Sequence, residues 1–283
     1  MNGGRKAASP HGGVATTNAA YAVALARAFA GALIFGLPLL LTMEMWWLGF
    51  EADPRRLTLF LLVDLALLYG LSHVAGFEES HNRIDDVLDA FAAFFVAAVV
   101  AALLLSLIGV IEPGQPLREV AGKIAVQAVP LSFGAMVGAK LLGEGEHIDE
   151  QEHWRRSYPG SLFLMLAGAL FVSFTVAPTE EIYLIAYLMS GWQTLALIAL
   201  SLVLLHVTVF NLGLPHQDKR ASSGAASSLL RFTLPGYAIA VLASFYILWT
   251  FGRLDGAFDH AAAIVAVLAL PGAVGAAIAR VVI

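Results

Sequence analysis

Long apolar runs separated by short polar turns occupy almost the whole chain. A helix that crosses the hydrocarbon core of a bilayer needs about 20 mostly apolar residues, and eight runs of the sequence reach that length. The turns between them hold proline, glycine and charged residues, which end helices and favour water. The pattern predicts an all-α polytopic membrane protein with eight transmembrane helices, at Ala24–Trp47, Leu57–Phe77, Ala90–Ile111, Val120–Leu142, Leu162–Leu188, Trp192–Leu212, Phe232–Phe251 and Ala261–Ile283.

Composition supports the membrane class and excludes several others. Hydrophobic residues make up 59% of the chain and charged residues only 13%, which is about half the charged share of a soluble domain. So few polar groups cannot cover the surface of a soluble enzyme, and a net charge of −5 argues against binding to nucleic acid. The absence of cysteine excludes disulfides, thiolate metal sites and cysteine catalysis.

The two halves of the sequence repeat each other. The segment Ala30–Leu33 recurs as Ala167–Leu170 at a spacing of 137 residues, and Pro130 recurs as Pro271 at a spacing of 141. Repeated prolines and carboxylates carry more weight than repeated alanines, because both are costly inside a membrane span. The duplication predicts two parallel four-helix repeats related by a pseudo-twofold axis along the membrane normal. Paired positions at the first spacing are Thr42 and Thr179, Glu44 and Glu181, Asp64 and Ser201, and Tyr69 and His206.

The duplication also gives the expected organisation of the chain. Residues 1–19 are small and polar and should form a disordered tail, residues 20–143 and 160–283 the two repeats, and residues 144–159 a cytoplasmic linker. The stretch 143–153 is acidic and contains two histidines, which would suit a weak divalent-metal site. A solvated linker fits the same composition better.

Basic residues set the expected orientation in the membrane. With a cytoplasmic N-terminus, 11 of the 16 lysines and arginines lie on the cytoplasmic side and five on the other, as the positive-inside rule requires. An even number of spans brings the C-terminus to the same side. We therefore expect a multi-pass protein of a bacterial inner membrane with both termini in the cytoplasm.

Ionisable groups within the apolar runs are the candidate functional residues, because such groups are expensive in lipid. Pro178 lacks an N–H and frees a backbone carbonyl one turn earlier, and two glutamates follow it. Carboxylate, hydroxyl and carbonyl oxygens together suit a hard cation such as Na⁺, Ca²⁺ or Mg²⁺, or a proton. The predicted site lies towards the outer surface and comprises Glu44, Glu180, Glu181, Thr42 and Thr179 around the helix break at Pro178, with the three glutamates as the metal-binding hypothesis.

Three further polar residues extend this site across the predicted membrane. Asp64 lies deeper than the glutamates, and Tyr69 and His206 lie deeper still on the cytoplasmic half. A graded series of titratable groups is what a proton or cation path requires. We therefore predict an ion channel or an ion- or proton-coupled transporter, although Asp64 and His206 would also serve as structural hydrogen-bond partners of packed helices.

The chain also resembles a bacterial family of integral membrane proteins of unknown function. The resemblance rests on the segment Val176–Ile182, which reads VAPTEEI, on Met189–Trp192, and on the eight-helix layout. It implies the membrane architecture and no particular activity.

Two other function classes compete with transport. The Glu180–Glu181 pair resembles the start of the motif of CAAX-type intramembrane glutamic proteases, but Ile185 stands near the place of that family's arginine, and Asn211 follows His206 at the wrong interval. A membrane sensor or assembly protein would need a larger loop surface than the turns offer. We therefore expect a non-enzymatic protein without an organic cofactor, whose partners are the lipid bilayer and a small cation or proton, and whose composition is compatible with a homo-oligomer.

Overall fold

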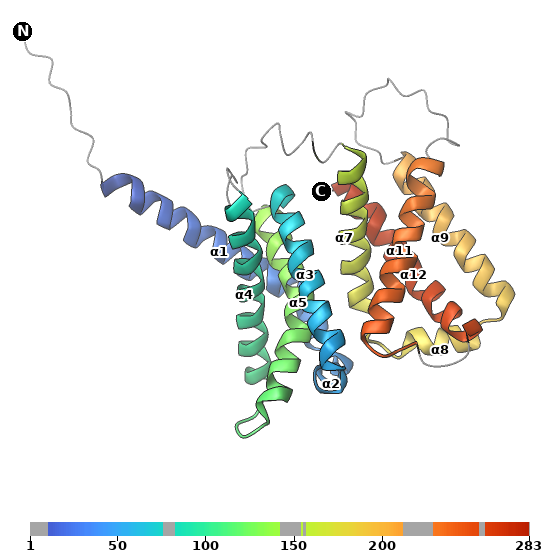
Figure 1. Ribbon diagram of the computed structural model, residues 1–283, viewed down its shortest axis with the longest axis horizontal. Helices are drawn as coiled ribbons and strands as arrows, with labels where there is room; N and C mark the ends of the chain where they lie inside the picture. The colour runs from blue at the N-terminus through green and yellow to red at the C-terminus, as the bar shows by residue number, and fades with distance from the viewer. Residues whose placement is uncertain are drawn as a thin grey trace, which may run out of the picture.

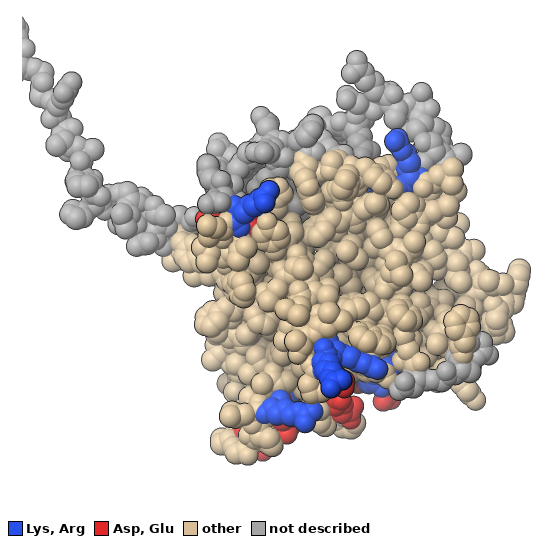
Figure 2. Space-filling view, viewed as in Figure 1, with Lys and Arg blue, Asp and Glu red and all other residues tan. Residues whose placement is uncertain are grey.

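The computed structural model is all-helical over the residues that it describes, which are 11–75, 83–141, 154, 157–211, 229–254 and 258–282. Within these ranges, eight helical segments are long and apolar enough to cross a membrane, as the hydrophobic pattern predicts. Figure 2 shows charged side chains gathered near the two ends of the molecule, with a belt of other residues between them. The expected linker stretch 143–153 lies outside the described residues.

The two halves contain the same order of elements (Figure 1). Each begins with a long helix and a short one, followed by three long helical segments. We call the face with the short helices the lower face, as it is seen in Figure 1, and the opposite face the upper face. The amino-terminal half comprises α1 (His11–Leu40), α2 (Met43–Glu51), α3 (Pro54–Ala75), α4 (Arg83–Leu107) and α5 (Leu117–Leu141). The carboxy-terminal half comprises α7 (Tyr158–Val176), α8 (Glu181–Leu188), α9 (Gly191–Asn211), η1 (Leu229–Thr233), α11 (Leu234–Thr250) and α12 (Phe258–Val282).

The predicted continuous helices Ala24–Trp47 and Leu162–Leu188 are wrong, because each is a long helix followed by a short one. In the second case α7 ends two residues before Pro178, whose ring cannot continue the helical ladder. In the first, Thr42 adopts an extended conformation, with φ −89° and ψ 116°. The short helix after it contains two tryptophans and two glutamates, which favour the membrane interface. Figure 1 shows α8 lying across the lower end of its half and α2 nearly end-on at the lower end of its own.

Helix α4 begins at Arg83, a full two turns before the expected start at Ala90. Its first turns therefore include Asp86 and Asp89, which the sequence pattern had assigned to a loop. Carboxylates are favoured near a helix N-terminus, where backbone N–H groups lack partners. At the other end of the chain, α1 begins at His11 and so includes residues that were expected to belong to the tail; residues 1–10 are outside the described ranges.

Glycines set the closest helix contacts in both halves. In the amino-terminal half the backbone of Gly31 on α1 lies against Gly134 and Gly138 on α5, and in the carboxy-terminal half Gly168 on α7 lies against Gly275 on α12. A Cβ at any of these positions would collide with backbone atoms of the facing helix. At Gly134, Gly168 and Gly275 it would also press on a side chain. Small residues allow membrane helices to approach this closely. The two pairs occupy repeated sequence positions, which agrees with the duplication; the pseudo-twofold relation stays a prediction.

The halves meet along aromatic side chains and border a partly open cavity. On the lower side, Phe60 packs edge-on against Phe174 and Phe251 across the junction, with ring centroids 5.1 and 5.7 Å apart. Higher up, an apolar cavity of about 300 Å³ lies between the halves. Its lining offers no polar side chain to an ion, since it consists of Phe35, Leu71, Phe133, Val137, Ala167, Gly168, Phe171, Val172, Gly275, Ile278 and Ala279.

Candidate functional site

Asp64 is the buried acidic residue at the centre of the candidate site. It lies on α3 with 1% of its surface exposed, and both of its carboxyl oxygens are 3.2 Å from the Ser132 hydroxyl oxygen on α5. The same hydroxyl lies 2.6 Å from the carbonyl oxygen of Val129. A serine has one proton to donate. When that proton goes to Val129, the serine oxygen can accept a hydrogen bond from a protonated Asp64.

This environment does not suit a bare carboxylate. Moving an ionised carboxylate from water into a low-dielectric interior costs several kcal/mol unless a cation or several donors compensate. Ser132 is the hydrogen-bond donor that Asp64 has among the described residues. The carboxyl group therefore needs a proton or a bound cation, and a group in this position within a membrane span is a functional candidate by default.

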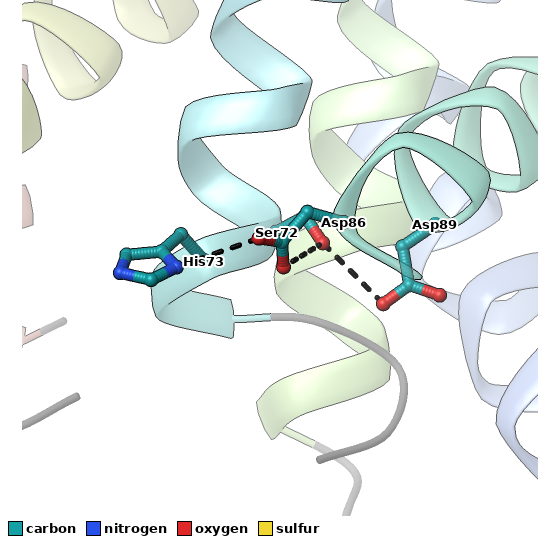
Figure 3. A network of polar contacts seen from close by, with 4 residues as sticks. All are labelled: Ser72, His73, Asp86 and Asp89. Atoms are coloured by element: carbon teal, nitrogen blue, oxygen red, sulfur yellow. Dashed lines mark hydrogen bonds and ion pairs between the residues drawn. The ribbon is translucent and has the colours of Figure 1, made fainter. Parts of the chain in front are cut away.

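A second group of polar side chains lies above Asp64, at the upper ends of α3 and α4 (Figure 3). The Ser72 hydroxyl is 3.4 Å from one carboxyl oxygen of Asp86 and 3.4 Å from one of Asp89. The His73 ring, about half exposed, places Nδ1 3.5 Å from Asp86. Both aspartates are buried and the serine fully so. The Ser72 hydroxyl has one proton and can donate it to one of the two carboxyl groups at a time.

A third group lies below Asp64, near the lower end of α5. The Lys123 ammonium group donates to the carbonyl oxygen of Val110 at 3.0 Å and pairs with Glu119 at 2.6 Å. One turn above it, the Gln127 amide donates to the Leu39 carbonyl at 3.3 Å, and its own oxygen is buried without a hydrogen-bond partner among the described residues. Polar contacts therefore continue from the lower face towards the level of Ser132.

We call these three groups the buried polar file. Ser72 is eight residues from Asp64 on α3, which corresponds to about 12 Å along the helix axis. Leu68 is fully buried between them. The file is therefore a set of separate stations, and passage between them requires water or movement of side chains. Its members are Glu119, Lys123 and Gln127 below, Asp64 and Ser132 in the middle, and Ser72, Asp86 and Asp89 above.

The glutamates predicted to bind an ion lie outside this file. Glu44 is half-buried in the first turn of α2, whereas Glu180 and Glu181 are exposed at the start of α8. The described part of the chain contains no group of three or more histidine, aspartate or glutamate side chains that could hold a metal, so the three glutamates do not form one. Their position in the first turn of a short helix has its own physical reason, the helix dipole.

The predicted hydroxyl ligands are hydrogen-bonded to their own backbone. The Thr42 hydroxyl donates to the Pro38 carbonyl at 2.7 Å, and the Thr179 hydroxyl donates to the Val176 carbonyl at 2.9 Å. Pro178 lies in the turn that separates α7 from α8, as a helix break. These contacts cap the ends of the two long helices.

Tyr69 and His206 lie in different halves. Tyr69 is on α3 with 39% of its surface exposed, and His206 is half-buried on α9, where its Nδ1 lies 2.8 Å from the Thr233 hydroxyl of η1. His206 is 15 residues past the start of α9, or about 22 Å from the lower end of that helix. Glu181 lies at that lower end, so the pairing that a glutamic protease would need is not assembled.

Comparison with known proteins identifies the family. The family model described as "putative integral membrane protein (DUF2391)" matches residues 24–283. The chain belongs to this family. No curated protein and no solved structure matches it. Membership of DUF2391 agrees with the eight membrane-spanning segments and with the resemblance carried by the segment Val176–Ile182.

Sequence reasoning found one station of the file and missed the rest in this DUF2391 member. Asp86 and Asp89 are three residues apart and so share a helix face, but the apolar pattern places the start of the span at Ala90 and both aspartates in a loop. Lys123 and Gln127 are spaced by four residues inside an apolar run. That spacing, which places both on the same side of α5, was the available signal.

Proposed function

We propose that this membrane protein moves protons, or a small cation in exchange for protons, through the buried polar file of its amino-terminal half. The observation that carries the proposal is Asp64, a carboxyl group with 1% exposure inside a membrane span and a single serine as its described donor. Such a group binds and releases a proton or cation whenever its surroundings change. A merely structural hydrogen bond would not need an acid there.

A transporter fits this arrangement better than an open channel. Fully buried Leu68 separates the middle station from the upper one, and the cavity between the halves is lined by apolar side chains. Neither feature offers a continuous wet path for an ion. Stepwise transfer between stations, with side chains or water bridging the gaps in turn, is the behaviour expected of a carrier.

The proposal includes an orientation. The distribution of lysine and arginine favours a cytoplasmic upper face and cytoplasmic termini in a bacterial inner membrane. In that orientation Asp86 and Asp89 lie towards the cytoplasm and Lys123 towards the outside. Movement inward would pass from the lower face through Asp64 to the upper aspartates. The protein is proposed to act without chemical catalysis.

Ion flux in reconstituted liposomes tests the proposal. Fluxes of H⁺, Na⁺, K⁺ and Ca²⁺ would be followed under imposed gradients and potentials for the wild type, Asp64→Asn and Glu181→Gln. We expect proton flux in the wild type, its loss in Asp64→Asn, and little change in Glu181→Gln, because Glu181 is exposed at the surface. Absence of flux for all four ions in the wild type would overturn the proposal.

Flux in the wild type shows whether the protein moves ions, and flux in the two variants shows which residue lies on the path. Flux that survives in Asp64→Asn would remove Asp64 from the path. Flux that is lost in Glu181→Gln instead would favour the site at the start of α8 that the sequence predicted.

A further inference from the structure

The described part of the carboxy-terminal half separates its charges between the two faces. Its acidic residues, Glu180, Glu181 and Asp259, lie near the starts of α8 and α12 at the lower end. Two arginines, Arg231 in η1 and Arg280 in the last turn of α12, lie at the upper end, where α12 finishes (Figure 1). Within the described ranges, the upper end of this half therefore carries positive charge and no acidic residue.

The guanidinium group of Arg280 lacks a full set of partners. It lies over the Phe232 ring of η1, 3.7 Å from the ring centroid. Its Nη1 atom is buried and has no hydrogen-bond partner among the described residues. A cation–π contact replaces only part of the hydration that a charged group loses on burial. Arg280 therefore requires an anion or another strong hydrogen-bond acceptor beside it.

This group lies at the boundary of the membrane-spanning region. Arg280 is in the last turn of the segment His260–Val281, and Phe232 is in the first turn of the segment Leu229–Thr250. The Phe232 ring also packs against the Tyr158 ring of α7, with centroids 5.6 Å apart, and Tyr158 is 46% exposed. Tyrosine is enriched at membrane–water interfaces. The cluster therefore reaches the protein surface at the depth of the lipid headgroups.

The backbone that carries Phe232 is unusual. Residues Leu229–Thr233 form a single π-helical turn that runs directly into α11. Such turns are rare and occur frequently at functional sites. Thr233, at the end of this turn, is held by the 2.8 Å contact of its hydroxyl with Nδ1 of His206 on α9. The position of the Phe232 ring under Arg280 is therefore fixed from two neighbouring helices.

We propose that the surface formed by Arg280, Phe232 and Tyr158 binds the phosphate group of an anionic phospholipid. The planar fork of an arginine matches the oxygens of a phosphate, and the resulting charge-assisted hydrogen bonds supply the acceptor that Arg280 requires. The exposed side chain of Arg231 adds positive charge that attracts an anionic headgroup. The site lies in the half opposite to the buried polar file, so it is independent of the transport proposal.

Apolar surface beside the cluster favours a lipid over a free phosphate ion. Leu230 and Leu234, which flank Phe232 along the chain, are 66% and 43% exposed. Exposed leucines at this depth offer contact to acyl chains, whereas a free phosphate ion is strongly hydrated and gains nothing from them. A phospholipid can use the charge of Arg280 and this apolar surface together.

Lipid binding to the full chain in detergent micelles tests the site, with native mass spectrometry as the readout. Phosphatidylglycerol, which is anionic, would be compared with phosphatidylcholine, which has no net charge, and with inorganic phosphate. We expect the wild type to prefer phosphatidylglycerol and Arg280→Gln to weaken its binding about tenfold, because the charge-assisted pair is lost. Arg83→Gln removes the same charge from an exposed site at the upper end of the other half and should leave binding nearly unchanged.

Arg280→Lys provides a second test where Arg280→Gln alters the fold. It keeps the positive charge without the planar fork, so it should retain the preference for phosphatidylglycerol at a lower affinity. Equal binding of the two lipids by the wild type, or equal weakening in Arg280→Gln and Arg83→Gln, would overturn the proposal. A preference lost as completely in Arg280→Lys as in Arg280→Gln would also overturn it. Displacement of the lipid by inorganic phosphate at the same concentration would assign the site to free phosphate and reject the lipid.

Discussion

The two halves of the molecule share a framework and differ in their interiors. Both pack their first long helix against their last through glycines, Gly31 with Gly134 and Gly168 with Gly275. Both close the third long segment with the same turn. Gly109 and Gly252 have φ of +78° and +68°, and the residue after each donates to the carbonyl five residues earlier. The two halves therefore share this framework.

The polar file occurs in one half. At six repeated positions, the amino-terminal half has two acids, an amide, a lysine and two serines, whereas the carboxy-terminal half has four apolar residues, a serine and a histidine. A duplicated scaffold needs its packing residues in both copies, whereas a functional site is needed once. The difference thus separates residues that form the fold from residues that add chemistry. The pairs are Asp64 with Ser201, Ser72 with Val209, Glu119 with His260, Lys123 with Ile264, Gln127 with Leu268, and Ser132 with Ala273.

The largest expected effect concerns the helix crossing at the lower face of the amino-terminal half. Gly122 on α5 lies against the backbone of Gly49 on α2 with no room for a Cβ, and the repeated positions are Ala186 and Ala263. We expect Gly122→Leu to displace α2 and to lower the free energy of unfolding by about 3 kcal/mol. Denaturation in micelles would measure it.

Ala263→Leu is the matched control for that substitution. Its site is half-buried and already holds a side chain, so we expect a smaller loss. Equal losses would mean that the two crossings are packed alike, and would weaken the comparison between the halves.

The next effect concerns the buried lysine of the file. Lys123→Met leaves the partly exposed Glu119 without its ion-pair partner and the Val110 carbonyl with the Gln115 amide as its remaining donor, which should cost about 2 kcal/mol of unfolding free energy. The double variant Lys123→Met/Glu119→Gln should recover part of this loss, because the repeated position is Ile264 and tolerates an apolar side chain. Failure of the double variant to recover anything would show that the ammonium group has a further role.

A pH-dependent effect is expected at Tyr183 of the carboxy-terminal half. Burial raises the pKa of Tyr183 to about 12, and the nearby Arg253 opposes the shift slightly. The repeated position is Trp46, whose indole nitrogen donates to the Leu40 carbonyl at 2.7 Å. Because Tyr183 holds its proton more tightly in the folded state, its contribution is complete below pH 10 or so and is lost as the pH rises towards 12.

Tyr183→Phe should therefore reduce the loss of unfolding free energy over that alkaline range by about 1 kcal/mol, once the partial exposure of Tyr183 is allowed for. The change would be measured as a shallower fall in melting temperature with pH. Tyr187→Phe, at an exposed site on the same short helix, is the control. A fall that Tyr183→Phe leaves as steep as before would contradict the assignment.

The smallest effect should be the same in both halves. Gly109→Ala and Gly252→Ala each place a Cβ on a residue with positive φ, which costs about 1 kcal/mol. Equal losses in unfolding free energy would support the shared framework. A loss in one variant and none in the other would indicate that the two turns are not equivalent.

The sequence was sufficient to predict the membrane-spanning segments and insufficient to predict where their helices end. Apolar length predicts a span because lipid leaves no alternative to a helix. It cannot show that the chain turns at Thr42 and lies along the surface, since the short helices are as apolar as the spans before them. Of the two helix breaks, the sequence indicates only the second, through Pro178, whose ring cannot continue a helix.

The site was predictable only in part, and for a related reason. Asp64 stands out because an acid interrupts an apolar run. Asp86 and Asp89 do not, because they adjoin a polar turn and their burial depends on packing against Ser72 of another helix. Conversely, the sequence pattern placed Glu180 and Glu181 inside an apolar run and so predicted that they lie in the membrane. The turn after α7 brings both to the surface of the protein.

The central claim is that one half carries the path, and a paired flux measurement tests it most directly. Initial proton flux into liposomes would be compared for Asp64→Asn and for Ser201→Ala, which alters the repeated and equally buried position. The account predicts flux at the level of protein-free liposomes for Asp64→Asn and wild-type flux for Ser201→Ala. Wild-type flux in Asp64→Asn, or equal loss in both variants, would contradict it.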